Sequence, residues 1–388
     1  MHAWAKLLFS VLCALLAGCA SVKPPSASSL APLLADSAFG APSEPIATDQ
    51  LFTLSPDMRA YLDSAEFRAH LRKRGTELGL VDALYQKSKL KIDYDDSVTR
   101  SAAGTYAARA GNCLSLVIMT AAFARELGLD VVFQSVQSGQ SWQRRGGIYL
   151  ASTHVNLSLA RPQQANDWAP RKVLTIDFLQ PQEVEGYRTR ALEEAAIVGM
   201  YMNNRAAEAM LAGRLDDAYW WARAALLHDP ASVNAYNTLG VVYQRHADSA
   251  LAERVLRAAL EREPENVLVM QNLVPVLGAL GKTAEALALQ QRAVGIEPHP
   301  PYHFFNQGMT AFKAGNFEKA KALFGREVAR APYNDEFHFW LAIACLNLGE
   351  QRMARKQLAL AVNYSTTQQL RGLYSSKLAQ LASRAMLN

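Results

Sequence analysis

Four prolines in the second half of the chain follow one another at intervals of 34 residues: Pro230, Pro264, Pro298 and Pro332. A fixed period of this length is typical of helical repeat arrays, in which each unit buries its apolar face against its neighbours. Over this half, the chain is therefore expected to form a stack of helix pairs rather than a single globular core.

The segment from Val233 to Pro264 matches the pattern of a tetratricopeptide repeat. Its matching positions are Tyr236, Leu239, Gly240, Tyr243, Ala252, Leu256, Ala259 and Pro264. Gly240 and Ala252 are small enough for the two helices to approach closely, and Pro264 ends the second helix. We expect five repeats between about residues 199 and 366 and a capping helix at about 367–386. Pro275 falls inside the first helix of the third repeat and is expected to kink it.

The first helices of stacked repeats line a concave groove, and here they carry amides and aromatics that suit an extended peptide. The candidate groove residues are Asn203, Asn234, Asn237, Gln244, Gln271, Tyr302, Phe305 and Phe312. The aromatics among them are equally compatible with ordinary packing. A repeat fold alone does not fix a function.

The N-terminus is typical of an export signal. Lys6 precedes an apolar run from Leu7 to Leu16, which is shorter than the roughly 20 residues that span a bilayer. The run ends in Leu16-Ala17-Gly18-Cys19, which looks like a bacterial lipoprotein box and implies cleavage before Cys19 and acylation of its thiol. An ordinary secretory signal cut nearby is the alternative.

We therefore assign 1–18 to a signal peptide and 19–50, rich in Ser, Pro and Ala, to a flexible tether. Ala20 stands where an Asp would retain a lipoprotein at the inner membrane, so the expected location is the outer membrane, facing the periplasm. The α+β region is placed at 51–195 and the all-α repeat solenoid at 196–388.

The middle of the chain carries the candidate chemistry. Helices are expected over 55–90, and Asn112 can cap a further helix that places Cys113 in its first turn. The helix dipole there favours the thiolate, which is the nucleophilic form. Strands are expected at 131–136, 148–160 and 173–178, with a polar loop at 137–147.

In this arrangement, His154 and Asp177 become near neighbours across a hairpin. A thiol, an imidazole and a carboxylate in this order suit a Cys113–His154–Asp177 catalytic triad. Taken singly, each residue is more often structural: a buried Cys is usually inert, and a strand His is usually part of the core or the surface.

These residues resemble the bacterial transglutaminase-like family that is often fused to tetratricopeptide repeats. The matching segments are 109–115, 124–128, 153–156, 176–178 and 201–205. The resemblance implies a papain-like α+β fold with Cys113 as nucleophile, His154 as base and Asp177 as the orienting carboxylate. It covers about residues 51 to 366.

Two functions are expected from these features. One is an envelope-anchored thiol acyl hydrolase or acyltransferase that acts on a periplasmic peptide or protein. The alternative is a non-catalytic, lipid-anchored repeat scaffold for protein–protein interaction. The net charge of +5, from 40 basic and 35 acidic residues, forms no basic stripe, so no nucleic-acid partner is expected. The four cysteines lack metal-ligand spacing, so neither a metal nor a cofactor is expected.

Replacing Cys19 with Ser tests the predicted anchor. Without the thiol, the precursor should stay unprocessed or be released from membranes, as measured by membrane fractionation and the mass of the N-terminus. A Cys19→Ser protein that is cleaved normally and stays fully membrane-bound would contradict the assignment.

Overall fold

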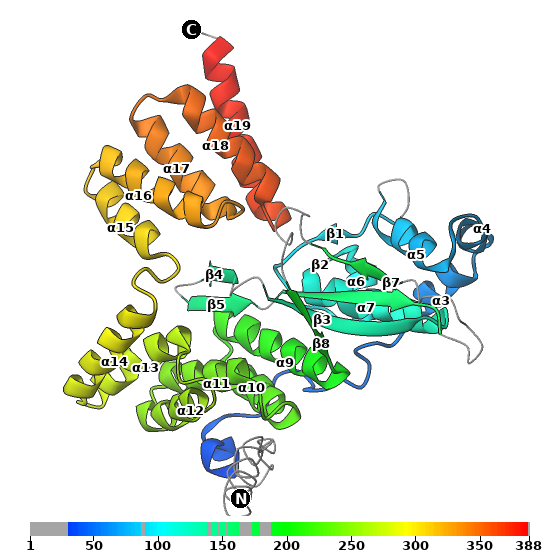
Figure 1. Ribbon diagram of the computed structural model, residues 1–388, viewed down its shortest axis with the longest axis horizontal. Coiled ribbons are helices and arrows are strands. Elements are labelled where there is room, and N and C mark those ends of the chain that lie inside the picture. The colour runs from blue at the N-terminus through cyan, green and yellow to red at the C-terminus, as the bar shows by residue number, and fades with distance from the viewer. Residues whose placement is uncertain are drawn as a thin grey trace, which may run out of the picture.

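The computed structural model describes residues 30–86, 90–137, 141–145, 148–152, 154–162, 173–178 and 188–386. The predicted signal peptide, Cys19 and the first part of the predicted tether lie outside the described residues. The described chain forms an α/β unit and an array of helices that begins at α9 (Figure 1).

Among these residues, five helices belong to the α/β unit: α3 (Pro56–Asp63), α4 (Ala65–Arg74), α5 (Thr76–Tyr85), α6 (Ala102–Ala108) and α7 (Cys113–Glu126). The first three confirm the helices predicted over 55–90. The side chain of Ser55 caps α3 by accepting a hydrogen bond from the Met58 N–H. All residues of α7 from Cys113 to Ala124 are buried, as expected of a helix that is apolar all round.

The main sheet is antiparallel and has the strand order β7-β6-β3-β8. Its strands are β3 (Asp130–Gln137), β6 (Val155–Ala160), β7 (Val173–Ile176) and β8 (Arg188–Leu192). Helix α7 packs on β3 and β6. A short parallel pair joins β1 (Asp93–Tyr94), which precedes α6, to β2 (Ala110–Gly111), which lies just before α7 in the chain. Helices and sheets are thus both present in this unit, whereas a papain-like fold remains a prediction.

A second hairpin corrects the strand prediction. The predicted loop contains β4 (Ser141–Arg145), which pairs with β5 (Ile148–Ser152), and the predicted strand over 148–160 is divided between β5 and β6. Arg145 is paired with Ile148, so only Gly146 and Gly147 connect the two strands. Two glycines between paired strands are a hairpin signal that the loop prediction overlooked.

Eleven helices follow in the described range 188–386. They are α9 (Glu194–Leu211), α10 (Leu215–His228), α11 (Val233–Arg245), α12 (Ser249–Arg262), α13 (Val267–Ala279), α14 (Thr283–Ile296), α15 (His303–Lys313), α16 (Phe317–Arg330), α17 (Asp335–Asn347), α18 (Gln351–Tyr364) and α19 (Gln368–Met386). Helices α9 to α18 pack as five pairs, and α19 packs on α18. Five helix pairs thus occupy the range of the five predicted repeats, and α19 occupies the range of the predicted capping helix. Helix α13 continues through Pro275, which is exposed.

The repeats form two blocks rather than one stack. Helix α14 does not pack on α15 as α10 packs on α11 or α16 on α17, and a connecting segment separates the two helices (Figure 1). The core of the α/β unit continues into the third repeat, whereas the core of α15 to α18 is separate. The first block is therefore α9–α14 and the second is α15–α19.

The break has a cause in the sequence. Leu239, Leu273 and Leu341 occupy the same position of successive repeats and are buried, but Gln307 holds this position in α15 and is exposed. Likewise, Gln290 in α14 is exposed where Leu256 and Phe324 are fully buried. An amide cannot replace the apolar contact without burying unpaired polar atoms, so stacking stops there.

Residues 30–46 form an ordered segment, the strap, which corrects the prediction of a flexible tether up to residue 50. They contain two short 3-10 helices, η2 (Ala31–Leu33) and η3 (Asp36–Ala38), and lie along the first two repeats. Leu30 and Phe39 are buried in the shared core. The composition of the strap is that of a flexible linker. Contacts with aromatic side chains of the repeats nevertheless hold it in one conformation.

Among the residues that the structure describes, no helix has the length and apolar character needed to cross a membrane.

Two glycine substitutions test the repeat register. A Cβ at Gly240 would lie 2.6 Å from Cγ of Leu256, whereas a Cβ at Gly278 would meet nothing within 4 Å. Gly240→Ala should therefore lower the free energy of unfolding by roughly 1–3 kcal/mol through overpacking. Gly278→Ala, the matched control, should raise it by up to about 1 kcal/mol because Ala favours a helix. Urea unfolding measures both, and equal effects would contradict the register.

Candidate functional site

The start of α7 is built as the sequence predicts. The Asn112 side chain caps the helix by accepting from the Ser115 N–H at 2.9 Å, which leaves Cys113 as the first helical residue. Gly111 allows the close approach of this turn to α6, because a Cβ there would lie 2.7 Å from Cβ of Ser115 and 3.0 Å from Cγ2 of Thr105. The Cys113 side chain is 8% exposed.

The structure brings Cys113, His154 and Asp177 together. His154 Nε2 lies 2.6 Å from Asp177 Oδ1, and the ring also shares a hydrogen bond with Cys113. His154 stands just before β6 and Asp177 just after β7, so the pairing of Leu157 with Ile176 sets their distance. The predicted proximity of the three residues is confirmed.

His154 is charged at neutral pH. Burial alone would lower the pKa of His154, but hydrogen bonds to Asp177 and Cys113, together with electrostatic attraction to both, raise it to about 9. The site therefore holds a buried imidazole ring, with a raised pKa, between the Asp177 carboxylate and the Cys113 sulfur. Such a hydrogen-bonded chain holds the ring in one orientation.

Asn156 completes this cluster and was missed by the sequence analysis. Its Nδ2 donates to Asp177 Oδ2 at 2.9 Å, so both carboxylate oxygens are held. Its Oδ1 is buried and has no hydrogen-bond partner in the described part of the chain. The signal was available, because Asn156 lies two residues after His154 on the polar face of the same strand.

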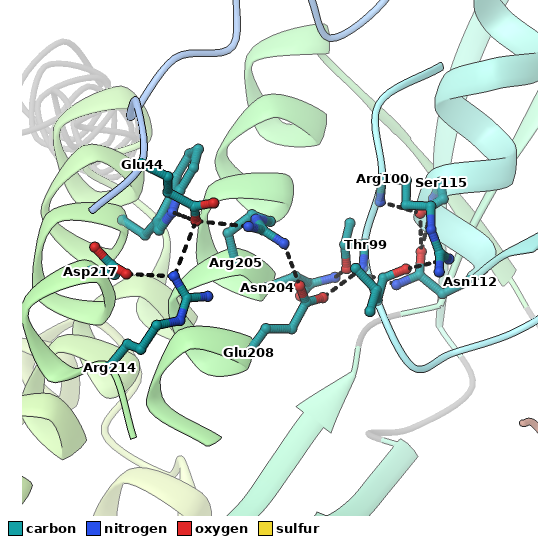
Figure 2. A network of polar contacts seen from close by, with 12 residues as sticks. Glu44, Thr99, Arg100, Asn112, Ser115, Asn204, Arg205, Glu208, Arg214 and Asp217 are labelled. Atoms are coloured by element: carbon teal, nitrogen blue, oxygen red, sulfur yellow. Dashed lines mark hydrogen bonds and ion pairs between the residues drawn. The ribbon is translucent and has the colours of Figure 1, made fainter. Parts of the chain in front are cut away.

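A polar network behind the cap connects the α/β unit to the first repeat (Figure 2). The Thr99 hydroxyl accepts from Asn112 Nδ2 at 2.8 Å and from Asn204 Nδ2 at 3.2 Å. The Thr99 N–H donates to Glu208 at 2.7 Å. Glu208 also accepts from Arg205 at 3.0 Å, and Asn204, Arg205 and Glu208 all lie on α9. The helix that carries Cys113 is thus fixed to the repeats.

The same network reaches the strap. Glu44 accepts from Arg205 at 2.7 Å and from the Trp221 indole at 2.9 Å (Figure 2). Beside it, the N–H and the hydroxyl of Ser43 both donate to Asp217 at 2.6 Å, and Arg214 also binds Asp217.

An aromatic anchor holds the middle of the strap. The Phe39 ring stacks on Tyr219 with 4.0 Å between centroids and an interplanar angle of 1°, and it lies 4.4 Å from the His246 ring. Asp36 accepts from the Tyr219 hydroxyl at 2.5 Å and from Arg223 at 2.7 Å. The strap is therefore held through one aromatic residue between two carboxylates.

The main chain of the strap is held by repeat side chains as well. Tyr219 accepts from the Ala35 N–H at 2.9 Å, and Tyr243 donates to the Leu33 carbonyl at 2.8 Å. At Gly40, the N–H donates to Asp216 at 2.9 Å, while the carbonyl accepts from the Trp220 indole at 2.6 Å. None of these contacts was predicted, although three consecutive aromatics, Tyr219-Trp220-Trp221, were a visible signal.

The predicted groove residues divide into two groups. Asn203, Asn234, Gln244 and Gln271 are half-buried, and Asn237 is buried and accepts from Asn272 Nδ2 at 2.8 Å. Tyr302 and Phe305 are buried in the core of the second block, and Phe312 packs on Phe317 and Trp340. The packing alternative therefore holds for these aromatics, and they do not line a groove.

Cys345 and Cys113 are both buried and are not joined by a disulfide. Within the described residues, no group of three or more His, Cys, Asp or Glu side chains is placed to hold a metal ion.

No protein-family model and no curated protein matches the chain. Solved structures do match. TTC0263, a tetratricopeptide-repeat protein of Thermus thermophilus, has 20% sequence identity and a TM-score of 0.31, with 47% of this chain and 99% of that chain covered. YrrB, described as a tetratricopeptide-repeat protein with an unusual peptide-binding site, has 23% identity, a TM-score of 0.25 and coverages of 46% and 92%. PilF of Pseudomonas aeruginosa has 21% identity, a TM-score of 0.30 and coverages of 49% and 87%.

These comparisons correct the expected activity. TTC0263 and YrrB are described as tetratricopeptide-repeat proteins, and none of the three structures named here is described as an enzyme. The prediction of a transglutaminase-like cysteine peptidase or acyltransferase is therefore wrong. The roles of nucleophile, base and orienting carboxylate expected for Cys113, His154 and Asp177 stay untested predictions.

The charge on His154 predicts a pH-dependent stability. Because folding raises the pKa of His154 from 6.5 to about 9, its contribution is complete below pH 6.5 and is lost as the pH rises through 9. The loss should be about 3 kcal/mol of unfolding free energy. Urea unfolding of wild-type and His154→Gln proteins at pH 6, 7.5 and 9.5 measures it. A difference between the two proteins that does not change with pH would contradict the buried imidazolium.

Proposed function

We propose that this protein is a repeat scaffold for protein–protein interaction and that its first block binds an extended polypeptide segment. The observation that carries the proposal is a row of amides on the first helices of three successive repeats. Asn203, Asn237 and Gln271 occupy the same position of α9, α11 and α13, one repeat apart.

The chemistry of the row suits a polypeptide main chain. An amide side chain both donates and accepts, so it can pair with a peptide N–H and C=O alike. Asn203 Oδ1 is buried and has no hydrogen-bond partner among the described residues, which leaves an acceptor to be satisfied. The bond from Asn272 to Asn237 indicates that side chains of neighbouring repeats meet along this face.

The strap supports the same conclusion. The first two repeats already hold one segment of this chain by hydrogen bonds to its main chain at Leu33, Ala35 and Gly40. These repeats therefore have the side chains needed to bind an extended polypeptide.

We propose in addition that Cys19 carries a lipid anchor and that the scaffold works at the bacterial envelope, on the periplasmic face of the outer membrane. The support is the sequence Leu16-Ala17-Gly18-Cys19 after an apolar run, with Ala20 following it. The partner would then be a periplasmic protein or peptide. A papain-like fold for the α/β unit stays a prediction, and in this proposal the unit serves as a rigid support for the first repeat.

Site-specific cross-linking tests the amide row. The photoreactive residue benzoylphenylalanine is placed at Gln271 in the full chain, and irradiated cells are analysed for cross-linked products. We expect a small set of discrete products, because a partner segment passing along the row contacts this position. The combined Asn203→Ala and Asn237→Ala substitutions should reduce their yield at least tenfold.

The matched control is the same photoreactive residue at Arg254, which is exposed on α12, the second helix of its repeat. It should give none of the products seen at Gln271. Equal products at the two positions, or no product at Gln271, would overturn the proposed function.

A further inference from the structure

The strap lies where a ligand would lie, on the outside of helices that are already complete. Helices α9 to α12 pack on one another in the same pairwise way as the later repeats. Apart from two short 3-10 turns, the strap has no secondary structure of its own. Side chains of the repeats, rather than bonds within the strap, thus fix its path.

Some of the contacts that hold the strap are exposed and individually weak, whereas others, such as those from Ser43 to Asp217, are partly buried. Arg223 is paired with Asp36 at a site where both side chains are partly exposed, at 29% and 45%. The bonds to Gly40 are exposed as well. Exposed ion pairs and hydrogen bonds of this kind exchange readily with water. The strong anchors are two buried side chains, Leu30 and Phe39, whose relative exposures are 1% and 8%.

The surface under the strap has a definite chemistry. Tyr219 offers a flat ring for an aromatic side chain, Arg223 lies on one side of it, and Arg205 with the Trp221 indole lies on the other. Trp220 and Asp216 bind the main chain at Gly40, where a Cβ would lie 3.2 Å from Asp216 Oδ2, so a small residue fits best there. The surface therefore fits an extended segment with an aromatic residue flanked by carboxylates.

We infer that the strap is an exchangeable internal ligand, and that a partner segment with an aromatic residue between two carboxylates replaces it on the first two repeats. This inference rests on the proposed function, in which the repeats bind an extended polypeptide. It adds a second surface, which is closed in the unbound chain.

Because of Arg205, a partner segment needs a carboxylate at the position of Glu44. Its side chain is 17% exposed and binds both Glu44 and Glu208 (Figure 2). A segment without a carboxylate at the position of Glu44 would leave Arg205 and the Trp221 indole without that acceptor. A segment that supplies one preserves the network to Thr99 and Asn112, so exchange leaves the support of α7 intact.

A labelled peptide tests the exchange directly. The probe is a fluorescein-labelled peptide with the sequence of residues 30–46, and its anisotropy is measured with the detergent-solubilised full chain. In wild type, the tethered strap competes at an effective concentration on the order of millimolar. A chain with Phe39→Ala and Glu44→Ala should therefore bind the peptide at least tenfold more tightly than wild type. Gln50→Ala, at an exposed position beyond the strap, should behave as wild type.

Changes in the peptide test its chemistry. A peptide with Phe39→Ala should lose at least tenfold in affinity for the substituted chain, and so should a peptide with Glu44→Ala. Equal affinity of the original peptide for the wild-type and substituted chains, or no binding to a substituted chain that is still folded by circular dichroism, overturns the inference.

Hydrogen exchange on the wild-type protein provides a measurement that does not depend on a substituted chain. The N–H groups of Ala35, Gly40 and Ser43 should exchange at a lower free energy of opening than those of α10, because the strap can leave while the repeats stay folded. Equal free energies overturn the inference. If the peptide fails but cross-linking at Gln271 persists, the exchange is wrong and the proposed function stands. If the peptide binds as expected but cross-linking at Gln271 fails, the exchange stands and the amide row is not a binding surface.

Discussion

Thr99 holds the two parts of this molecule in one arrangement. Its side chain is almost fully buried, and its hydroxyl accepts from the cap of α7 and from α9 at once. Its N–H is taken by Glu208. Buried polar groups are costly unless every one finds a partner, so this small cluster tolerates few positions of α9 relative to α7. The first repeat is therefore oriented by the same residues that position Cys113.

The repeat half was the most predictable part, because its period is local and regular. The 34-residue spacing and the small residues at 240 and 252 gave the correct helix pairs. The same spacing hid the break, since Pro298 keeps the period while Gln290 and Gln307 remove the apolar contact. Periodicity reports the length of each unit, whereas stacking depends on the side chains at the contact positions.

The candidate site could be predicted in part. A cap before a helix, a His beside a strand and an Asp after the next strand are ordered signals, and the hairpin register brings them together. Asn156 could have been found from its place two residues after His154, whereas Thr99 gave no such signal, because it acts through contacts that only the folded chain creates. The strap is the extreme case. Its Ser, Pro and Ala composition predicts disorder, and its order comes from residues about 180 positions away, such as Tyr219.

Specific contacts in the second block stabilise the break between α14 and α15. Glu327 stands where the other repeats have a small residue such as Ala259, and it is buried. Its carboxylate accepts from the Phe305 N–H at the start of α15, where the residue before the helix provides no side-chain cap.

Arg330 binds Glu327 at 3.0 Å and also donates to the carbonyls of His299 and Pro300 in the connecting segment. The segment is thus fixed to the second block instead of mediating a stack on α14. Leu287 and Val294 of α14 remain about half exposed as a result. Because a Glu in the core is stable only when its charge is paired, Glu327 and Arg330 together hold the start of α15 and the connecting segment in this arrangement.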